Sequence, residues 1–158
     1  MKNQFQQLFL RIAISVTMLS AVADRFGFWG DNSSWGNWKN FEVYTQKLTF
    51  FLPEIMSIFS AYIATFLEIL FPVMLILGYK TRIASYGSGM LLLVFALSMA
   101  IVLGIKAPLD YSVWVGCAGA FLLAAQQEYQ YSIDYMIRKN NPDQIRITKK
   151  VFRFRKTL

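Results

Sequence analysis

The sequence contains no histidine and a single cysteine, Cys117. These residue types supply most protein ligands for zinc, haem and iron–sulfur clusters, so the chain lacks the usual ligand sets for such centres. It also lacks the side chain that most often moves protons near neutral pH. We therefore expect no intrinsic metal or haem site. Any redox or proton chemistry would need carboxylates, tyrosines, a borrowed cofactor such as quinone, or a partner subunit.

Charge is scarce as well. Only 16% of the 158 residues are charged, against about 25% in an ordinary soluble domain, and 56% are apolar or aromatic. The third of four long apolar stretches contains no charge and would form a helix of about 31 Å. The sequence predicts an all-α polytopic membrane protein, a bundle of four transmembrane helices within a domain of residues 1–136. The expected spans are 8–28, 55–77, 83–103 and 111–127.

The first apolar stretch has a second interpretation. Basic residues, an apolar segment and the small residues of Ala21-Val22-Ala23 follow one another in the order found in a secretory signal peptide. We expect the segment to be retained instead, as the first transmembrane helix.

Basic residues are concentrated at one end of the chain. Eight of the 16 lysines and arginines lie between Arg138 and Lys156, and Lys80 and Arg82 lie in the short connection between the second and third stretches. Positive residues favour the cytoplasmic side of a membrane, so both termini are expected there. Residues 137–158 are interpreted as a basic cytoplasmic tail that contacts anionic lipid headgroups rather than nucleic acid.

The 24–54 segment is too aromatic for a plain solvated linker. Its apolar residues from Trp38 to Leu52 follow helical spacing, which predicts an amphipathic helix that lies on the outer interface of the membrane or caps the bundle. Asp24 and Arg25, where this segment begins, are interpreted as interface caps.

Small residues recur every fourth position in the last stretch, at Gly116, Ala120 and Ala124. Such spacing lets two helices approach closely. It predicts packing among the four helices of one chain, with contact between two copies as the alternative.

Two charges interrupt the apolar stretches, Arg11 in the first and Glu68 in the second. An unpaired charge at mid-membrane costs a few kcal/mol, so each needs a partner, water or a change of protonation. Their expected depths differ by roughly 9 Å, which an arginine side chain nearly bridges. Three interpretations remain: an ion pair that sets helix register, a polar pocket that holds a quinone headgroup or relays protons, and two separate groups.

Other polar residues surround these charges in a recognisable order. A leucine-rich run, a glycine and a Thr-Arg pair follow the glutamate, and Tyr131-Ser132-Ile133-Asp134 follows the last stretch. The residues concerned are Arg11, Glu68, Gly78, Thr81, Arg82, Ser132 and Asp134. This arrangement, over about residues 8–136, resembles the DoxX-like integral membrane protein family. The resemblance implies a four-helix protein of the bacterial inner membrane, and some relatives are subunits of quinone-linked oxidoreductases.

Two functions therefore remain. In the favoured one, the protein is a non-catalytic accessory subunit that recruits a membrane or periplasmic partner through its aromatic loop and basic tail. In the alternative, it is the membrane subunit of a quinone-linked oxidoreductase, with a quinone or proton site near Arg11 and Glu68. A small-solute transporter is less favoured because the four stretches show no inverted repeat.

Overall fold

The computed structural model describes residues 4–140, and every regular element within that range is a helix. Three helices are long and apolar enough to cross a membrane: α1 (Gln4–Arg25), α3 (Glu54–Leu77) and α4 (Thr81–Leu103). Their outer faces carry exposed apolar side chains such as Ile63 on α3, as expected of surfaces that face lipid. These helices overlap the first three predicted spans, although α1 ends at Arg25 rather than at residue 28.

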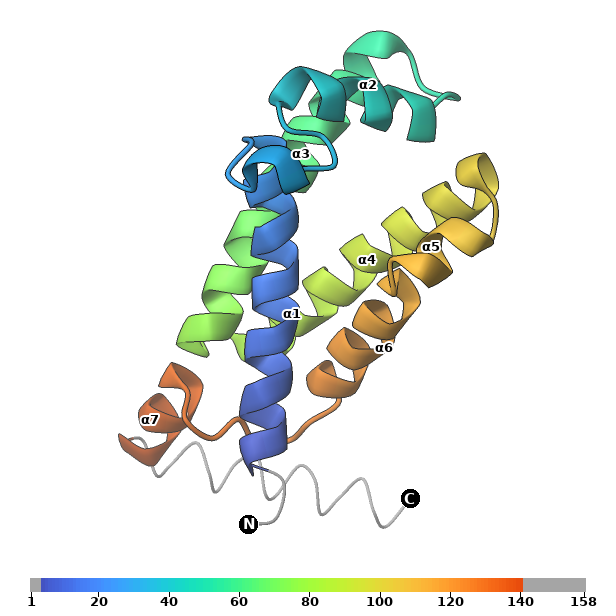
Figure 1. Ribbon diagram of the computed structural model, residues 1–158. Coiled ribbons are helices and arrows are strands. Elements are labelled where there is room, and N and C mark those ends of the chain that lie inside the picture. The colour runs from blue at the N-terminus through green and yellow to red at the C-terminus, as the bar shows by residue number, and fades with distance from the viewer. Residues whose placement is uncertain (1–3, 141–158) are drawn as a thin grey trace, which may run out of the picture.

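The fourth predicted span, 111–127, overlaps no helix of spanning length in the described part of the chain. It contains the 12-residue helix α6 (Val113–Ala124), preceded by the short helix α5 (Lys106–Asp110). Ser112 lies between them with a φ of 54°, a left-handed conformation that interrupts the helix. At 1.5 Å per residue α6 is about 18 Å long, shorter than the hydrocarbon core of a bilayer. Together, α5 and α6 run back along α4 (Figure 1).

Four helices, α1, α3, α4 and α6, form two antiparallel pairs. Helix α1 packs on α3, and α4 packs on α6, while the turn between α3 and α4 joins the pairs (Figure 1). The pairs diverge toward one end of the molecule, where helix α2 (Trp38–Leu48) lies. We call this the α2 end. The opposite end carries the start of α1 and helix α7 (Ile133–Asn140), and we call it the terminal end.

Helix α2 begins within the predicted amphipathic segment and ends at Leu48, earlier than expected. The Asn37 side chain caps its first turn by accepting a hydrogen bond from the Asn40 amide at 2.9 Å. Phe41 and Leu48 are buried against the rest of the protein. A 3₁₀ turn, η1 (Gly30–Asn32), lies between α1 and α2.

Helix α7 covers the boundary that the sequence suggested between residues 136 and 137. The first residues of the predicted basic tail are therefore the last turn of a helix. The rest of the tail, from residue 141, lies outside the described residues.

Small side chains bring α4 and α6 close together. Ala84 and Ala96 on α4 and Ala120 and Ala124 on α6 are fully buried. Gly116 is partly buried, and a Cβ there would lie 3.4 Å from the Leu92 side chain. These positions lie between helices of the same chain, and close backbone approach is what small residues permit in a membrane.

Candidate functional site

Arg11 and Glu68 neither pair nor share a pocket, which corrects the two interpretations that brought them together. Arg11 binds backbone carbonyls at the terminal end, whereas Glu68 pairs with Arg25. Arg25 lies 14 residues after Arg11, about 21 Å along α1, and its side chain extends back toward the middle of α3. The polar residues within the helices therefore form two separate clusters.

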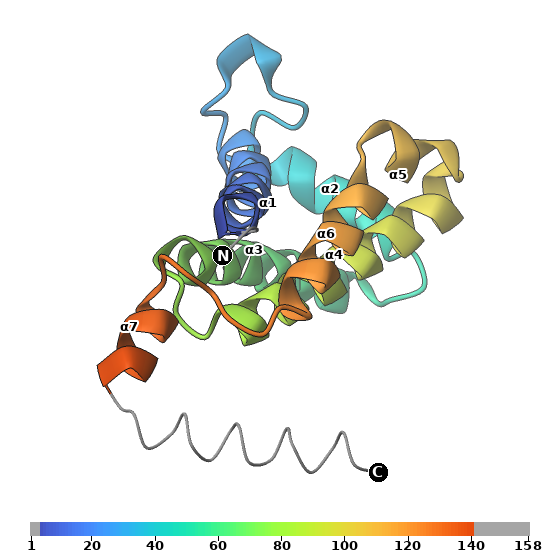
Figure 2. The ribbon, with the colours of Figure 1, turned by 90° about the horizontal axis from the view of Figure 1, so that it is seen from below.

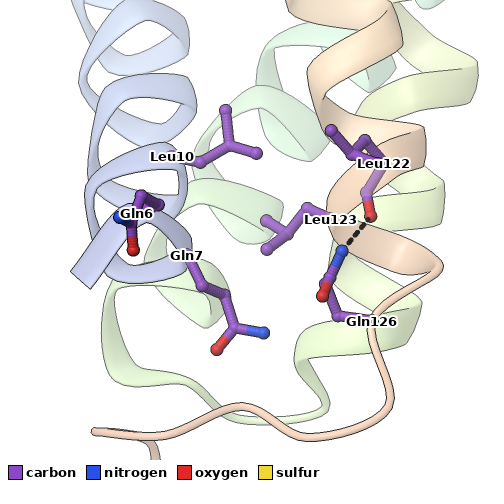
Figure 3. A pocket seen from close by; sticks show the side chains of 6 residues that line it. All are labelled: Gln6, Gln7, Leu10, Leu122, Leu123 and Gln126. Atoms are coloured by element: carbon purple, nitrogen blue, oxygen red, sulfur yellow. Dashed lines mark hydrogen bonds between the residues drawn. The ribbon is translucent and has the colours of Figure 1, made fainter. Parts of the chain in front are cut away.

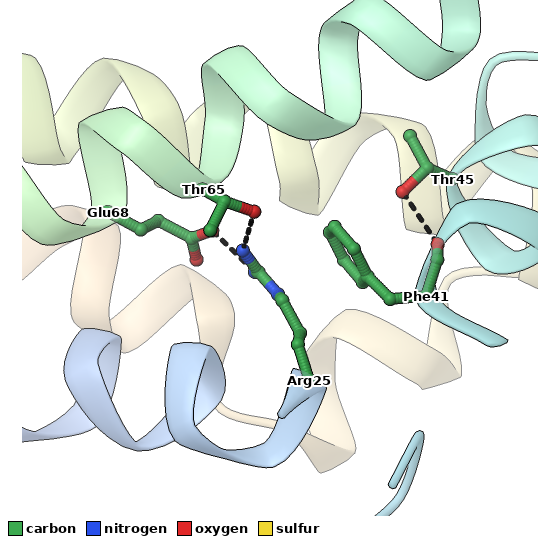
Figure 4. A network of polar contacts seen from close by, with 5 residues as sticks. All are labelled: Arg25, Phe41, Thr45, Thr65 and Glu68. Carbon is green, nitrogen blue, oxygen red and sulfur yellow. Dashed lines mark hydrogen bonds and ion pairs between the residues drawn. The ribbon is translucent and has the colours of Figure 1, made fainter. Parts of the chain in front are cut away.

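The first cluster is a buried ion pair between Arg25 of α1 and Glu68 of α3 (Figure 4). Their side chains are only 2% and 3% exposed. The other terminal nitrogen of the guanidinium donates a hydrogen bond of 2.6 Å to the Thr65 hydroxyl. Because each charge would be costly alone in an apolar surrounding, the pair holds α1 and α3 in one register.

Two aromatic rings cover this ion pair, and they belong to what we call the α2 region: α2 and the segment of residues 34–37 before it. The Arg25 guanidinium lies 3.9 Å from the centre of the Phe41 ring and 5.6 Å from that of Trp35. Both distances are within the range of cation–π attraction. The neighbouring Asp24 carboxylate accepts a hydrogen bond of 3.1 Å from the Ser34 amide. The end of α1 thus attaches the whole α2 region to the bundle.

The sequence interpretation missed Arg25 by treating it as an interface cap. A signal was present in the helical periodicity: Arg11, Met18 and Arg25 recur every seven residues. That spacing places the three side chains on one face of a helix, and all three are buried. An arginine in register with a buried methionine is expected to face the protein interior.

The second cluster lies at the terminal end, and we call it the terminal clasp: Arg11, Gly78, Ser132 and Asp134. The fully buried Arg11 guanidinium donates to four backbone carbonyls. Two belong to the last turn of α3, at Leu75 (2.9 Å) and Ile76 (3.2 Å). Carbonyls at a helix C-terminus have no partner within the helix and carry partial negative charge, so a buried cation satisfies them well. The others, both at 3.2 Å, belong to residues 130 and 131.

Asp134 connects the clasp to α4. Its carboxylate accepts hydrogen bonds from the backbone amides of Lys80 (2.8 Å) and Thr81 (2.7 Å), and its own amide donates to the Gly78 carbonyl at 3.0 Å. The carboxylate satisfies amides that the first turn of α4 cannot pair itself. Ser132 is buried beside it. Its hydroxyl accepts a 3.0 Å hydrogen bond from the Tyr135 amide in the first turn of α7.

Gly78 lets these parts meet. It ends α3 with a φ of +68°, the left-handed conformation that favours glycine. A Cβ at this position would lie 2.3 Å from the Ser132 Cβ and 2.6 Å from an Arg11 nitrogen. The predicted family residues Gly78, Ser132 and Asp134 are therefore brought together with Arg11, although not with Glu68.

The remaining predicted residues lie beside the clasp. Thr81 is fully buried at the start of α4, whereas Arg82 is exposed. Tyr129 follows α6, and its hydroxyl donates to the carbonyls of Leu123 (3.1 Å) and Ala124 (3.4 Å). Burial raises the pKa of Tyr129 above its ordinary value, which keeps this hydroxyl protonated as a donor.

A pocket of about 290 Å³ lies between α1 and α6 at the terminal end (Figure 3). Its walls combine amide and leucine side chains, so it offers hydrogen-bond donors and acceptors next to apolar surface. Two of the amides already donate hydrogen bonds, Gln7 to the Glu128 carbonyl (2.6 Å) and Gln126 to the Leu122 carbonyl (3.2 Å). The lining residues are Gln6, Gln7, Leu10, Leu122, Leu123 and Gln126.

The described residues contain no cluster of potential metal ligands. Between residues 4 and 140, no three histidine, cysteine, aspartate or glutamate side chains lie close enough together to hold an ion. The buried ion pair and the terminal clasp both use their polar groups for contacts inside the protein. As arranged here, these clusters brace helices against one another.

Comparison with known proteins identifies the family. The chain matches the DoxX family over residues 6–103, a segment that includes both buried arginines, Glu68 and Gly78. No curated protein and no solved structure matches the chain significantly. Because the matched segment exceeds half of the sequence and covers the three helices of spanning length except for the first two residues of α1, we conclude that the chain belongs to the DoxX family of membrane proteins.

Proposed function

We propose that this protein is a non-catalytic subunit of a larger membrane complex and binds its partner at the α2 end. The observation that supports this role is a set of exposed aromatic side chains in a region that is held to the helix bundle by polar contacts. Phe28 is 79% exposed, and Phe50 and Phe51 are each 68% exposed. The region that carries them is attached through Arg25 and Asp24. Exposed aromatic residues on a preorganised surface are typical of binding hot spots.

The proposed setting is the inner membrane of a bacterium, with four crossings. Helix α6 would make the fourth crossing together with its flanking segments. Lys80 and Arg82 lie at the terminal end, and the positive-inside rule supports a cytoplasmic position for that end. The α2 end would then face outward, where a periplasmic or membrane-anchored protein with an exposed apolar surface could bind.

Site-specific photo-crosslinking in native membranes tests this role. A photoreactive residue at Phe28 or at Phe51 is expected to give the same discrete protein adduct, which mass spectrometry then identifies. Ile63 provides a control, because it is also exposed, at 55%, but lies on the transmembrane part of α3. Adducts with lipid alone, or only with a second copy of this chain, would contradict a distinct partner.

A double substitution, Phe28→Ala with Phe51→Ala, tests how much these two side chains contribute to partner binding. Loss of two aromatic anchors should reduce the amount of the crosslinked partner that co-purifies by more than about tenfold. Both side chains are mostly exposed, so the variant should accumulate in the membrane normally. Unchanged co-purification of that partner would place the binding surface elsewhere.

A second candidate function is quinone binding, for which the pocket between α1 and α6 is the supporting observation (Figure 3). Amide groups can donate hydrogen bonds to the two carbonyls of a quinone ring, and leucines suit its apolar edge. The pocket contains Leu10, next to Arg11 in sequence but on another face of α1. This candidate therefore differs from the predicted site at Arg11 and Glu68.

Extraction of quinone from the purified protein distinguishes this candidate from the first. Leu10→Trp would fill the pocket and is expected to abolish quinone retention. Ile12→Trp is the matched control, because Ile12 is 38% exposed and does not line the pocket. Absence of quinone from the unsubstituted protein, or equal retention by the two variants, would count against quinone binding at this pocket.

A further inference from the structure

Helix α7 lies at the terminal end, beside the turn between α3 and α4, and projects to one side of the bundle (Figures 1 and 2). Its position is set by Asp134, whose carboxylate binds the amides of Lys80 and Thr81 and whose amide binds the Gly78 carbonyl. These three hydrogen bonds attach the first turn of α7 directly to the turn between α3 and α4. The direction of the helix is thereby fixed relative to two membrane-spanning helices.

This attachment also sets the depth of α7. Helix α3 ends at Leu77 and α4 begins at Thr81, so their connecting turn marks the level at which both leave the apolar layer. A helix that is bonded to that turn and projects to the side of the bundle is at the level of lipid headgroups. Tyr79 and Tyr131, which are 42% and 69% exposed, lie at the same turn and beside α7, as tyrosines at a membrane interface commonly do.

The exposed side chains of α7 divide into apolar and basic groups. Ile133, Met136 and Ile137 follow helical i, i+3, i+4 spacing and are 37%, 64% and 52% exposed. Arg138 and Lys139 occupy the last turn and are exposed. An apolar stripe beside basic residues is the pattern of a helix that lies in the plane of a membrane surface.

The α3–α4 turn adds two more cations to this surface. Lys80 and Arg82 are both exposed, and the contacts of Asp134 bring α7 beside them. The Asp134 carboxylate keeps its negative charge, which the buried Arg11 beside it offsets. We call this set of residues the α7 surface: Lys80, Arg82, Met136, Ile137, Arg138 and Lys139.

We propose that the α7 surface binds the headgroups of anionic phospholipids. Four cations at headgroup level attract anionic lipid, and each basic residue near a membrane surface contributes about 1 kcal/mol. Met136 and Ile137 enter the boundary between headgroups and acyl chains. The apolar stripe and the depth of the helix favour lipid over a soluble acidic partner. This proposal is independent of partner binding at the α2 end and of quinone binding.

Lipid retention by the full-length purified protein tests the proposal. The protein is mixed in detergent with equal amounts of phosphatidylglycerol and phosphatidylcholine, and the bound lipids are counted by native mass spectrometry. The test variant, Lys80→Gln with Arg82→Gln and Lys139→Gln, leaves intact the 3.2 Å hydrogen bond from Arg138 to the Gln127 carbonyl. We expect it to retain phosphatidylglycerol at least about tenfold more weakly, since three cations are lost.

A charge-matched control separates this surface from net charge. Lys39→Gln with Lys47→Gln and Lys106→Gln also removes three positive charges, but from α2 and α5. Both variants keep the same residues from 141 onward, so the tail contributes equally. A loss confined to the first variant supports the proposal. Equal losses in both variants, or no loss in either, overturn it.

Two further measurements complete the test. Asp134→Asn keeps every cation but weakens the attachment of α7, so it should also reduce phosphatidylglycerol retention. If that variant misfolds, Met136→Gln with Ile137→Gln replaces it, since both side chains are exposed; it should weaken retention by loss of the apolar anchor. Unchanged retention in the variant that folds contradicts the proposal. Equal retention of both lipids by the unsubstituted protein also overturns it and leaves the α7 surface to a protein partner.

Discussion

Glu68→Gln is expected to destabilise the protein by about 3–5 kcal/mol, the range for breaking a buried ion pair from one side. The substitution leaves the buried Arg25 guanidinium without its ion-pair partner, with the Thr65 hydroxyl and aromatic rings in contact and Asp24 as the remaining carboxylate that acts on it. An arginine cannot lose its proton at accessible pH, so it stays charged without a directly paired carboxylate. The measurement is the free energy of unfolding in mixed micelles, together with the amount of protein in the membrane.

The reverse substitution should be less damaging. Arg25→Met leaves a lone carboxyl, which can become neutral by taking up a proton. The double variant, Arg25→Met with Glu68→Gln, contains no buried charge and should recover much of the stability lost in Glu68→Gln. If the Glu68→Gln variant folds normally but loses quinone or partner binding, then Glu68 acts in function rather than in register, and our structural interpretation fails.

The second large effect is expected at Gly78. Replacement by alanine should cost about 1–2 kcal/mol for the left-handed backbone and a further 1–3 kcal/mol for crowding in the terminal clasp. The new Cβ would lie 2.3 Å from the Ser132 Cβ and 2.6 Å from an Arg11 nitrogen. Either α7 or the Arg11 side chain must move, and the carbonyls that Arg11 satisfies would lose their donor.

Gly30→Ala provides the matched control. Gly30 also has a positive φ, +55°, but an added Cβ there meets nothing within 4 Å. It should therefore show the backbone cost alone. Thermal unfolding of the two variants in the same detergent separates conformation from crowding. Equal destabilisation of Gly78→Ala and Gly30→Ala would show that the terminal clasp accommodates the added Cβ with no further loss of stability.

The two buried arginines of α1 illustrate different solutions to one physical problem. Arg25 is neutralised by an acidic side chain, whereas Arg11 is satisfied by carbonyl dipoles at a helix end. Both solutions tie α1 to α3, one at the terminal end and the other near the middle of α3. Helices in lipid gain little from hydrophobic association, so such polar contacts and close packing carry more of the task of holding them together.

Several parts of this architecture could be predicted from residues alone. The length and apolar character of the stretches that became α1, α3 and α4 predict spanning helices, because an unpaired backbone in lipid has few alternatives. The membership of Arg11, Gly78, Ser132 and Asp134 in a common pattern was also visible in their order. The break at Ser112 was not, because hydropathy does not report backbone conformation.

The partners of the buried charges could not be predicted from the sequence. Hydropathy places Arg11 and Glu68 at approximate depths, but it does not state how far α3 slides along α1 or which way each side chain extends. Arg25 reaches Glu68 because the helices are antiparallel and its long side chain bends back into the bundle. The sequence alone determined the helical membrane class, the three long spans and the residues that needed partners. Only the tertiary structure decided which partner each residue found, because that choice depends on the packing of helices distant in sequence.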